Sequence, residues 1–265
     1  MALSTKGPFV RHHAVVTGGG RGIGTAIAEA LARFGASISL VGRKAGVLEA
    51  TANRIARDHG VKVWTAQADV AEESAVRKAI AIVRDALGAP TILVNNAGVS
   101  ISSPFLKSDA ALWRKMLDTD LMGAVYATQA VLPAMLESNW GRIINVASTA
   151  GITGYAYIAA YCAAKHGMIG LTRALAVETA RTGVTVNAVC PGYADTEMTT
   201  KSIANIVEKT GRSREQAMAS LLLRNPQGRL IQPAEVADAV VWLSGEQAAS
   251  VTGQSIVIAG GELMP

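Results

Sequence analysis

The amino-acid sequence predicts an α/β fold in which a doubly wound parallel sheet carries helices on both faces. Short apolar runs of strand character alternate with Ala- and Leu-rich runs of helical length along the chain, and this alternation is typical of a parallel sheet with crossover helices. Hydrophobic residues make up 50% of the sequence and charged residues 17%, which suits a large buried core. Because no Pro-, Ser- or Gly-rich linker divides the chain, we expect a single domain over residues 1-265.

The first predicted strand, residues 14–17, leads into a glycine-rich turn and then a helix over residues 25–34. A second strand over residues 37–41 closes the unit. A turn of this kind places backbone amides and the positive end of a helix dipole where a pyrophosphate binds. Glycines also make plain turns, but their position between strand and helix favours a Rossmann-type dinucleotide site. The candidate binding residues in this turn are Gly18, Arg21, Gly22, Ile23 and Gly24.

The end of the second strand indicates which cofactor is bound. It reads Gly42-Arg43-Lys44, and no acidic residue follows until Glu49. An acidic residue at this point suits the free ribose 2′-hydroxyl of NADH, whereas an arginine suits the 2′-phosphate of NADPH. With Arg21 also in the glycine turn, we predict NADPH, with NADH as the second choice. The alternative is that Arg43 and Lys44 are the solvated start of a helix.

The alternation continues toward the carboxyl terminus. We predict strands over residues 61–66, 91–94, 142–147 and 184–189, helices over 72–86, 109–135 and 158–180, and a last helix that starts near Pro233. The carboxyl ends of parallel strands share one edge of the sheet, where ligands bind. The segments expected on this rim are the glycine turn, Asp69-Val70, Asn95-Asn96-Ala97-Gly98, Ser148 and Pro191-Gly192.

Ser148, Tyr161 and Lys165 are the candidate catalytic residues. Tyr161 and Lys165 are four residues apart on a predicted helix and therefore share a face. An ammonium one turn away lowers the pKa of a phenol, which makes Tyr161 a usable general acid or base. Ser148 follows a strand end and can stabilise a carbonyl oxygen that gains negative charge. Because none of the three supplies electrons, a redox reaction here needs a hydride from a cofactor.

Composition argues against several other classes of protein. The net charge is +5, but the basic residues are mostly scattered and no aromatic-interleaved basic patch exists, so we expect no nucleic-acid partner. The two cysteines and four histidines lack ligand spacing, so we expect no metal and no disulfide. No apolar run reaches about 18 residues and the first eight residues contain no apolar signal segment. We therefore predict a cytoplasmic protein with no membrane contact.

Taken together, these motifs resemble the short-chain dehydrogenase/reductase family over nearly the whole chain. The resemblance implies that Tyr161 donates a proton, Ser148 holds the substrate oxygen and Lys165 also grips the nicotinamide ribose. It further implies cofactor contacts for Asp69, Val70, Asn95, Ala97, Gly98, Tyr161, Pro191, Gly192 and Thr196. The matching segments, in order and spacing, are Thr17-Gly18-x-x-x-Gly22-Ile23-Gly24, Asn95 to Gly98, Ser148, Tyr161-x-x-x-Lys165, Pro191-Gly192 and Val251-Thr252-Gly253-Gln254.

Asp120 departs from the family pattern. The chain reads Thr119-Asp120-Leu121-Met122-Gly123, where relatives usually have an asparagine that supports a water relay to the lysine. Aspartate accepts hydrogen bonds as asparagine does, but it adds a charge that favours the ammonium of Lys165 and weakens its effect on Tyr161. We count Asp120 among the catalytic candidates and expect activity to survive with an altered pH profile.

Residues 199–230 interrupt the strand and helix rhythm, and in this family such a segment usually covers the substrate. From Lys201 to Arg229 it carries six basic residues against two acidic ones, a net charge of +4. This charge suits a phosphate-bearing substrate such as a thioester of CoA or acyl carrier protein, although a solubilising helix face would look the same. Parts of the segment also resemble 3-oxoacyl thioester reductases, 3-hydroxybutyrate dehydrogenases and aromatic polyketide ketoreductases.

The sequence therefore predicts an NADPH-dependent reductase of a small carbonyl substrate, with a 3-oxoacyl thioester as first choice. Two alternatives remain open. One is a dehydrogenase of secondary alcohols or 3-hydroxyacids that works in the oxidative direction. The other is a non-catalytic nucleotide-binding sensor or scaffold, which only Asp120 supports. Small residues along the helix over 158–180 permit close approach of another subunit, and relatives pair this helix, so we expect a homodimer or homotetramer.

Overall fold

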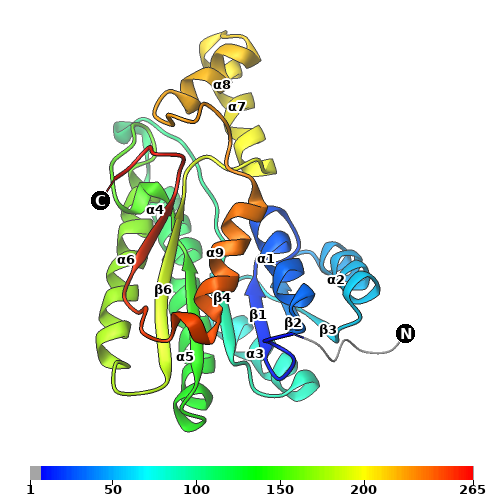
Figure 1. Cartoon of the computed structure of the whole chain (residues 1–265). Coiled ribbons are helices and arrows are strands. Elements are labelled where there is room, and N and C mark those ends of the chain that lie inside the picture. Colours follow the sequence, from blue (N-terminus) through cyan, green and yellow to red (C-terminus); the bar gives the residue numbers. More distant parts are fainter. Residues whose placement is uncertain (1–6, 265) are drawn as a thin grey trace.

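Seven parallel strands form one sheet in the order β3-β2-β1-β4-β5-β6-β7. The computed structural model describes residues 7–264 (Figure 1). The prediction that the first eight residues contain no signal segment concerns residues that mostly lie outside this range. From β1 the strand order runs outward in both directions, so the predicted doubly wound fold is confirmed. The strands are β1 (His13–Thr17), β2 (Ser37–Gly42), β3 (Val63–Gln67), β4 (Ile92–Asn95), β5 (Gly141–Val146), β6 (Val184–Pro191) and β7 (Ser255–Ile258).

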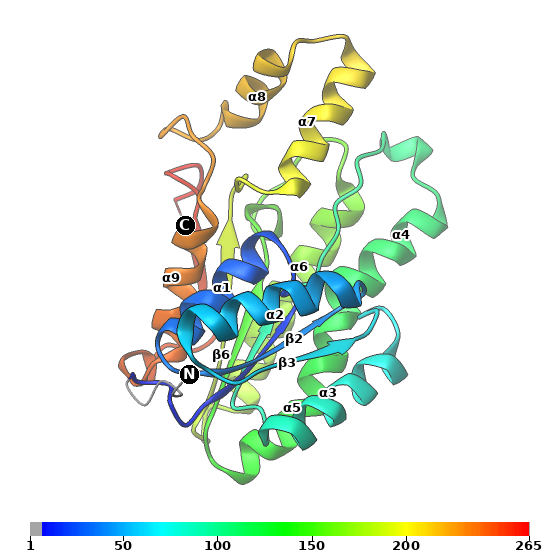
Figure 2. The ribbon, with the colours of Figure 1, turned by 90° about the vertical axis from the view of Figure 1, so that its right-hand side faces the viewer.

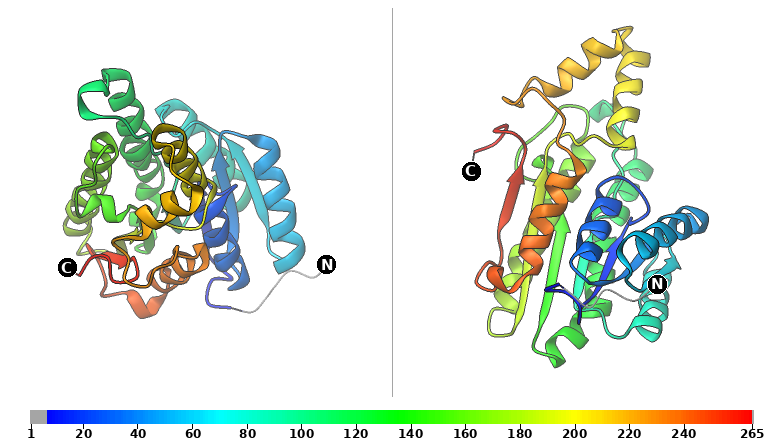
Figure 3. Two further views of the ribbon diagram at one scale, coloured as in Figure 1. Left: turned by 90° about the horizontal axis from the view of Figure 1, so that it is seen from above. Right: turned by 45° about the vertical axis from the view of Figure 1, so that its right-hand side comes forward.

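Helices cover both faces of the sheet (Figure 3). One face carries α1 (Gly22–Arg33), α2 (Ala45–His59) and α9 (Pro233–Ser244), and the other carries α3 (Glu73–Leu87), α5 (Gly123–Glu137) and α6 (Ala159–Glu178). Within residues 7–264, no helix has both the length and the apolar character needed to span a membrane.

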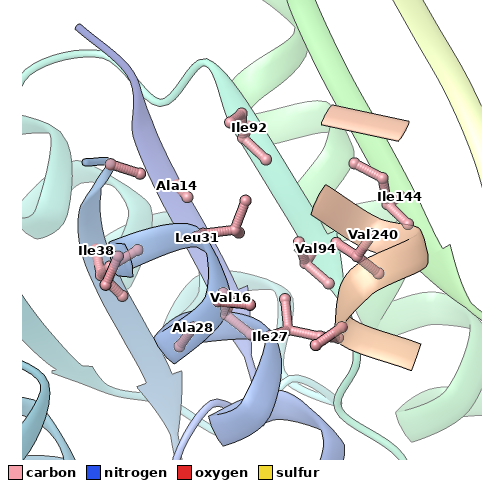
Figure 4. Packing of buried hydrophobic residues seen from close by; sticks show 14 of the residues in the cluster. Ala14, Val16, Ile27, Ala28, Leu31, Ile38, Ile92, Val94, Ile144 and Val240 are labelled. Atoms are coloured by element: carbon pink, nitrogen blue, oxygen red, sulfur yellow. The ribbon is translucent and has the colours of Figure 1, made fainter. Parts of the chain in front are cut away.

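The core consists of two apolar layers, one on each side of the sheet. Because successive strand residues point to opposite faces, Val15 of β1 packs in the layer under α3 and α5, whereas Ala14 and Val16 pack in the layer under α1 and α9. Figure 4 shows the second layer, in which Leu31 of α1 and Val240 of α9 meet β1 and its neighbours. This packing fixes the register of the strands, and with it the positions of the residues at their carboxyl ends.

We expect folding stability to decrease as the pH falls below about 6.5, the ordinary pKa of histidine. His13 is buried, and its imidazole nitrogens lie 2.7 Å from the Gly88 carbonyl oxygen and 2.7 Å from Ser39 Oγ. Burial lowers the pKa of His13, so the unfolded chain takes up a proton at a higher pH than the folded chain does. The contribution of His13 to the free energy of unfolding is fully present above the pKa of histidine in the unfolded chain. It is lost as the pH falls toward the lower pKa of His13 in the folded chain.

Urea titrations over this pH range measure the effect on the free energy of unfolding. His13→Gln should reduce the pH dependence, whereas replacement of the exposed His166 by glutamine should leave it as it is. An unchanged dependence in His13→Gln would show that other groups account for it.

The helix predicted over residues 109–135 is three segments in the structure. They are α4 (Ala110–Leu117), a π-helical segment (Asp118–Met122) and α5. The π-helical segment carries Asp120, whose side chain points inward and is fully buried. Gly123 follows this segment and packs against Val70, which lies just after β3; a Cβ at Gly123 would lie 2.9 Å from the Val70 side chain. Single π turns often occur at functional sites, and this one brings Asp120 to the rim of the sheet.

The predicted lid over residues 199–230 is a pair of helices that stands beyond the carboxyl ends of the strands, as Figures 1 and 2 show. They are α7 (Glu197–Thr210) and α8 (Arg214–Leu222). Asn205 of α7 donates a 2.9 Å hydrogen bond to Ser102 Oγ, and Glu197 accepts one from Arg21 in the glycine turn. The lid is therefore connected to segments that follow β4 and β1.

Candidate active site

Ser148, Tyr161, Lys165 and Asp120 come together at the carboxyl end of β5. Lys165 lies on the second turn of α6 and is 2% exposed. Its Nζ donates a 2.9 Å hydrogen bond to the Val146 carbonyl oxygen, lies 3.6 Å from Asp120 Oδ1, and is 5.6 Å from the centre of the Tyr161 ring. The predicted grouping of a hydroxyl, a phenol and an ammonium is therefore present in the structure.

A tight turn holds Ser148 against α6. The segment Thr149–Gly151 forms a 3-10 turn in which Ser148 Oγ accepts a 3.1 Å hydrogen bond from the Ala150 amide. At Gly151 a Cβ would lie 2.7 Å from the Lys165 carbonyl oxygen, so only glycine allows this approach. Because its oxygen accepts from the backbone, the Ser148 hydroxyl keeps its proton available for donation to another oxygen.

Asp120 and Lys165 form a buried ion pair. The Val99 amide donates to both carboxylate oxygens of Asp120, at 3.1 and 3.3 Å. Burial raises the pKa of Asp120 to about 6, and the ammonium of Lys165 opposes this rise. Burial also lowers the pKa of Lys165, which Asp120 in turn opposes. A Cβ at Gly98 would lie 2.6 Å from Asp120 Oδ1, so the glycine at this position makes room for the carboxylate.

Tyr161 has a raised pKa, which corrects the prediction that Lys165 lowers it. Burial is the main cause and the Asp120 carboxylate adds to it, while a hydrogen bond with Ser148 acts in the opposite direction. The ammonium of Lys165 does not prevent this rise, since Asp120 Oδ1 lies 3.6 Å from its Nζ and offsets its charge. Tyr161 therefore keeps its proton near neutral pH, as a proton donor must.

The glycine turn lies against two other predicted cofactor segments. Gly18 and Gly22 have φ angles of +65° and +52°, which L-residues with side chains rarely adopt. A Cβ at Gly18 would lie 2.9 Å from Ala97 Cα, and one at Gly22 would lie 3.2 Å from Thr196 Cγ2. The turn, the segment after β4 and the start of the lid thus lie close together on the rim.

The two arginines predicted to bind the ribose phosphate each form an exposed ion pair. Arg43 Nη1 lies 3.7 Å from Asp69 Oδ2, and both side chains are about half exposed. Arg21 Nη1 lies 2.5 Å from Glu197 Oε2, and this pair is exposed to a similar degree. Exposed ion pairs are worth roughly 0 to 1 kcal/mol, so both arginines can exchange these partners for a phosphate.

The side chain of Asn95, a predicted cofactor contact, makes its hydrogen bonds within the protein. Its side chain is buried, and its Nδ2 donates to Thr128 Oγ1 at 3.1 Å and to Asn145 Oδ1 at 2.9 Å. The alternation along β4 explains this, because Asn95 shares the face of Leu93, which lies under α5. Its side chain therefore connects β4 to β5 and α5.

Several side-chain contacts beside the site were not predicted from the sequence. Thr17 Oγ1 accepts hydrogen bonds from the Asn96 and Ala97 amides, at 3.0 and 3.1 Å, and so holds the segment after β4. Tyr155 and Glu262 are hydrogen-bonded to each other although 107 residues separate them. No local pattern marks such contacts. Among the residues that the structure describes, no three His, Cys, Asp or Glu side chains are grouped as metal ligands would be.

Comparison with known proteins identifies the family. The model of the short chain dehydrogenase family matches residues 12–206. A putative ketoacyl reductase of Streptomyces coelicolor is 38% identical over 94% of this chain and 95% of its own length. A D-beta-hydroxybutyrate dehydrogenase of Rhizobium meliloti is 36% identical over 94% of this chain and 97% of its own. The crystal structure of a variant actinorhodin polyketide ketoreductase with NADPH superposes with a TM-score of 0.92, 37% identity and 99% coverage of both chains.

Proposed function

The chain belongs to the short chain dehydrogenase family of oxidoreductases, and on this premise we propose that it is an NADPH-dependent carbonyl reductase. The observation that carries the proposal is the grouping of Ser148, a protonated Tyr161 and Lys165 at the strand ends, beside the glycine turn. The relative named as a ketoacyl reductase and the ketoreductase structure with NADPH support the same direction of reaction.

The glycine turn fits a dinucleotide, because Gly18 and Gly22 keep the backbone clear of side chains. When bound, the nicotinamide supplies the hydride. Ser148 donates a hydrogen bond to the carbonyl oxygen and orients it, since its own oxygen is held by the Ala150 amide. Tyr161 then gives its proton to that oxygen as negative charge develops on it. The ammonium of Lys165 stabilises the phenolate that remains.

We expect Arg43→Gln to weaken NADPH binding about ten- to hundredfold, because a hydrogen bond to a charged group contributes roughly 1.5 to 3 kcal/mol. NADH lacks the 2′-phosphate, so its affinity should change little. Fluorescence titration of both cofactors measures the dissociation constants without turnover. Lys44→Gln is the matched control, since it removes the neighbouring charge and leaves the guanidinium. Equal losses for NADPH and NADH would contradict the assignment of Arg43 to the phosphate.

The substrate is, in this proposal, a 3-oxoacyl thioester. Its support is the net positive charge of the lid and the ketoacyl reductase name of a relative. The relative named as a D-beta-hydroxybutyrate dehydrogenase favours the second candidate, oxidation of a free 3-hydroxyacid. The test is NADPH consumption with acetoacetyl-CoA or an aryl ketone, and NADP⁺ reduction with 3-hydroxybutyrate. Fast turnover of the thioester supports the proposal, and fast oxidation of the hydroxyacid alone supports the second candidate. Cofactor binding without any turnover supports a sensor or scaffold.

We also propose a homodimer or homotetramer. Fewer of the small residues on α6 are available to contact another subunit than the sequence suggests. Ala160 and Ala164 are buried within the chain, and a Cβ at Gly167 would lie 2.8 Å from Leu121. Ala163 and Gly170 are exposed and available for close approach. Light scattering of the purified protein measures the oligomeric state.

A further inference from the structure

A carboxylate from the end of the chain reaches the segment next to Ser148. The Tyr155 hydroxyl is hydrogen-bonded to Glu262 Oε1 and lies 2.8 Å from Thr149 Oγ1. A carboxylate only accepts hydrogen bonds, so Tyr155 donates to Glu262 and accepts from Thr149. Thr149 follows Ser148 directly. Two hydrogen bonds therefore connect Glu262 to the residue beside the one that orients the substrate oxygen.

The turn after β7 fixes the place of Glu262. Gly260 and Gly261 have φ angles of +60° and +89°, and a Cβ at Gly261 would lie 3.3 Å from Pro226 Cγ at the end of the lid. On its other side, Glu262 Oε2 lies 3.0 Å from the Cβ position of Gly192, which follows β6. Glu262 is thus held between the lid, the turn after β6 and Tyr155.

The charge of Glu262 has no cationic partner in direct contact. None of the ion pairs found within residues 7–264 includes it. The nearby cation is Arg224, whose guanidinium lies 5.1 Å from the centre of the Tyr155 ring and donates to the Gly154 carbonyl oxygen at 3.4 Å. Arg224 is exposed to solvent, which screens its charge. The partly buried carboxylate therefore determines the local charge beside Thr149.

The Glu262 carboxylate also acts on Tyr193, the aromatic residue next to Tyr155. The Tyr193 ring lies 6.5 Å from that of Tyr155, in an edge-to-face arrangement. Burial and the Glu262 carboxylate both raise the pKa of Tyr193, and Arg224 opposes them. Tyr193 in turn contributes to the raised pKa of Tyr161. Glu262, Tyr155 and Tyr193 therefore form one contiguous group beside Thr149.

We propose that Glu262 is a specificity-determining residue that rejects substrates with a carboxylate beside the reacting carbonyl; this inference rests on the proposed function. In a free 3-oxoacid, one carbon separates the ketone from the carboxylate. With the ketone oxygen on Ser148, the proposal places this carboxylate on the side of Thr149 and Tyr155, toward Glu262. Two like charges in a partly buried site repel each other more strongly than in bulk water. Neutral ketones, esters and thioesters carry no such charge, and the anionic groups of a CoA thioester lie far from the ketone.

The test compares acetoacetate with methyl acetoacetate, which differ in charge but share the reacting ketone. We expect the wild-type protein to prefer the ester about ten- to hundredfold in kcat/KM. Glu262→Gln keeps an acceptor for Tyr155 and should narrow this ratio about tenfold, mainly through KM for the acid. Tyr155→Phe keeps the charge and should keep the preference. Glu137→Gln, at the far end of α5, controls for net charge.

Calorimetric titration of the NADP⁺ complex with each compound measures the same preference without turnover. If the ester binds better but neither compound is reduced, the proposed function fails and the inference about Glu262 stands. If the wild-type protein binds and uses the acid as well as the ester, the inference is wrong. The same holds if Glu262→Gln leaves both ratios unchanged.

Discussion

Tyr161→Phe is expected to lower kcat by about 10²- to 10⁴-fold, the usual contribution of a positioned general acid. The substitution removes the proton that the carbonyl oxygen receives and the hydrogen bond with Ser148. The ring remains, so the contact between Lys165 and its face is kept. Because no part of the glycine turn is altered, NADPH affinity should stay close to that of the wild-type protein.

Three measurements separate this result from a folding defect. NADPH consumption gives kcat, fluorescence titration gives the cofactor affinity, and thermal denaturation gives Tm. Tyr157→Phe is the matched control, because Tyr157 precedes Tyr161 by four residues and its side chain is 66% exposed. The control should retain full activity. A Tyr161→Phe protein with activity within a few fold of wild type would exclude Tyr161 as the proton donor.

The fold was largely predictable because its signals are local. Each predicted strand and most helices appear within about three residues of their expected ends. The exceptions need tertiary information. The edge strand β7 has only four residues and each is only partly buried, so its pattern is weak, and it forms by pairing with β6. The π-helical segment at Asp118–Met122 has the same residue types as a regular helix.

The site was predictable where a motif carries the chemistry and was missed where the environment does. Ser148, Tyr161 and Lys165 have residue types and spacing that indicate proton transfer, and the structure brings them together. The direction of the pKa shift of Tyr161 depends on burial and on Asp120, 41 residues away in sequence. Glu262 meets Tyr155 only through the folding of the last strand. Such effects are properties of packing and leave no pattern in the sequence.

Asp120→Asn is expected to change the pH dependence of both carbonyl reduction and alcohol oxidation. Asparagine has nearly the same shape and still accepts the hydrogen bond from the Val99 amide, which lies 3.1 Å from Asp120 Oδ1. What it removes is the negative charge 3.6 Å from Lys165 Nζ. The ammonium then acts on Tyr161 without this opposition, so the pKa of Tyr161 should fall.

The sign of the effect differs between the two directions. Reduction needs Tyr161 protonated, so the decline of its rate at high pH should begin at a lower pH in the variant. Oxidation of an alcohol needs the phenolate, so its rate at neutral pH should rise. In the wild-type protein, Asp120 has a pKa of about 6, and its protonation below that value removes the same negative charge. An inflection near this pH should therefore be present in the wild-type profile and absent in that of Asp120→Asn.

Steady-state rates measured from about pH 5 to 10 in both directions of the reaction give both profiles. Asp118→Asn is the control, because Asp118 lies in the same π-helical segment but its carboxylate is exposed. It should leave the profile unchanged. If Asp120→Asn also leaves both the rate and its pH dependence unchanged, the charge of Asp120 has no part in proton transfer. An altered profile would mean that the buried carboxylate, and not Lys165 alone, determines at which pH Tyr161 exchanges its proton.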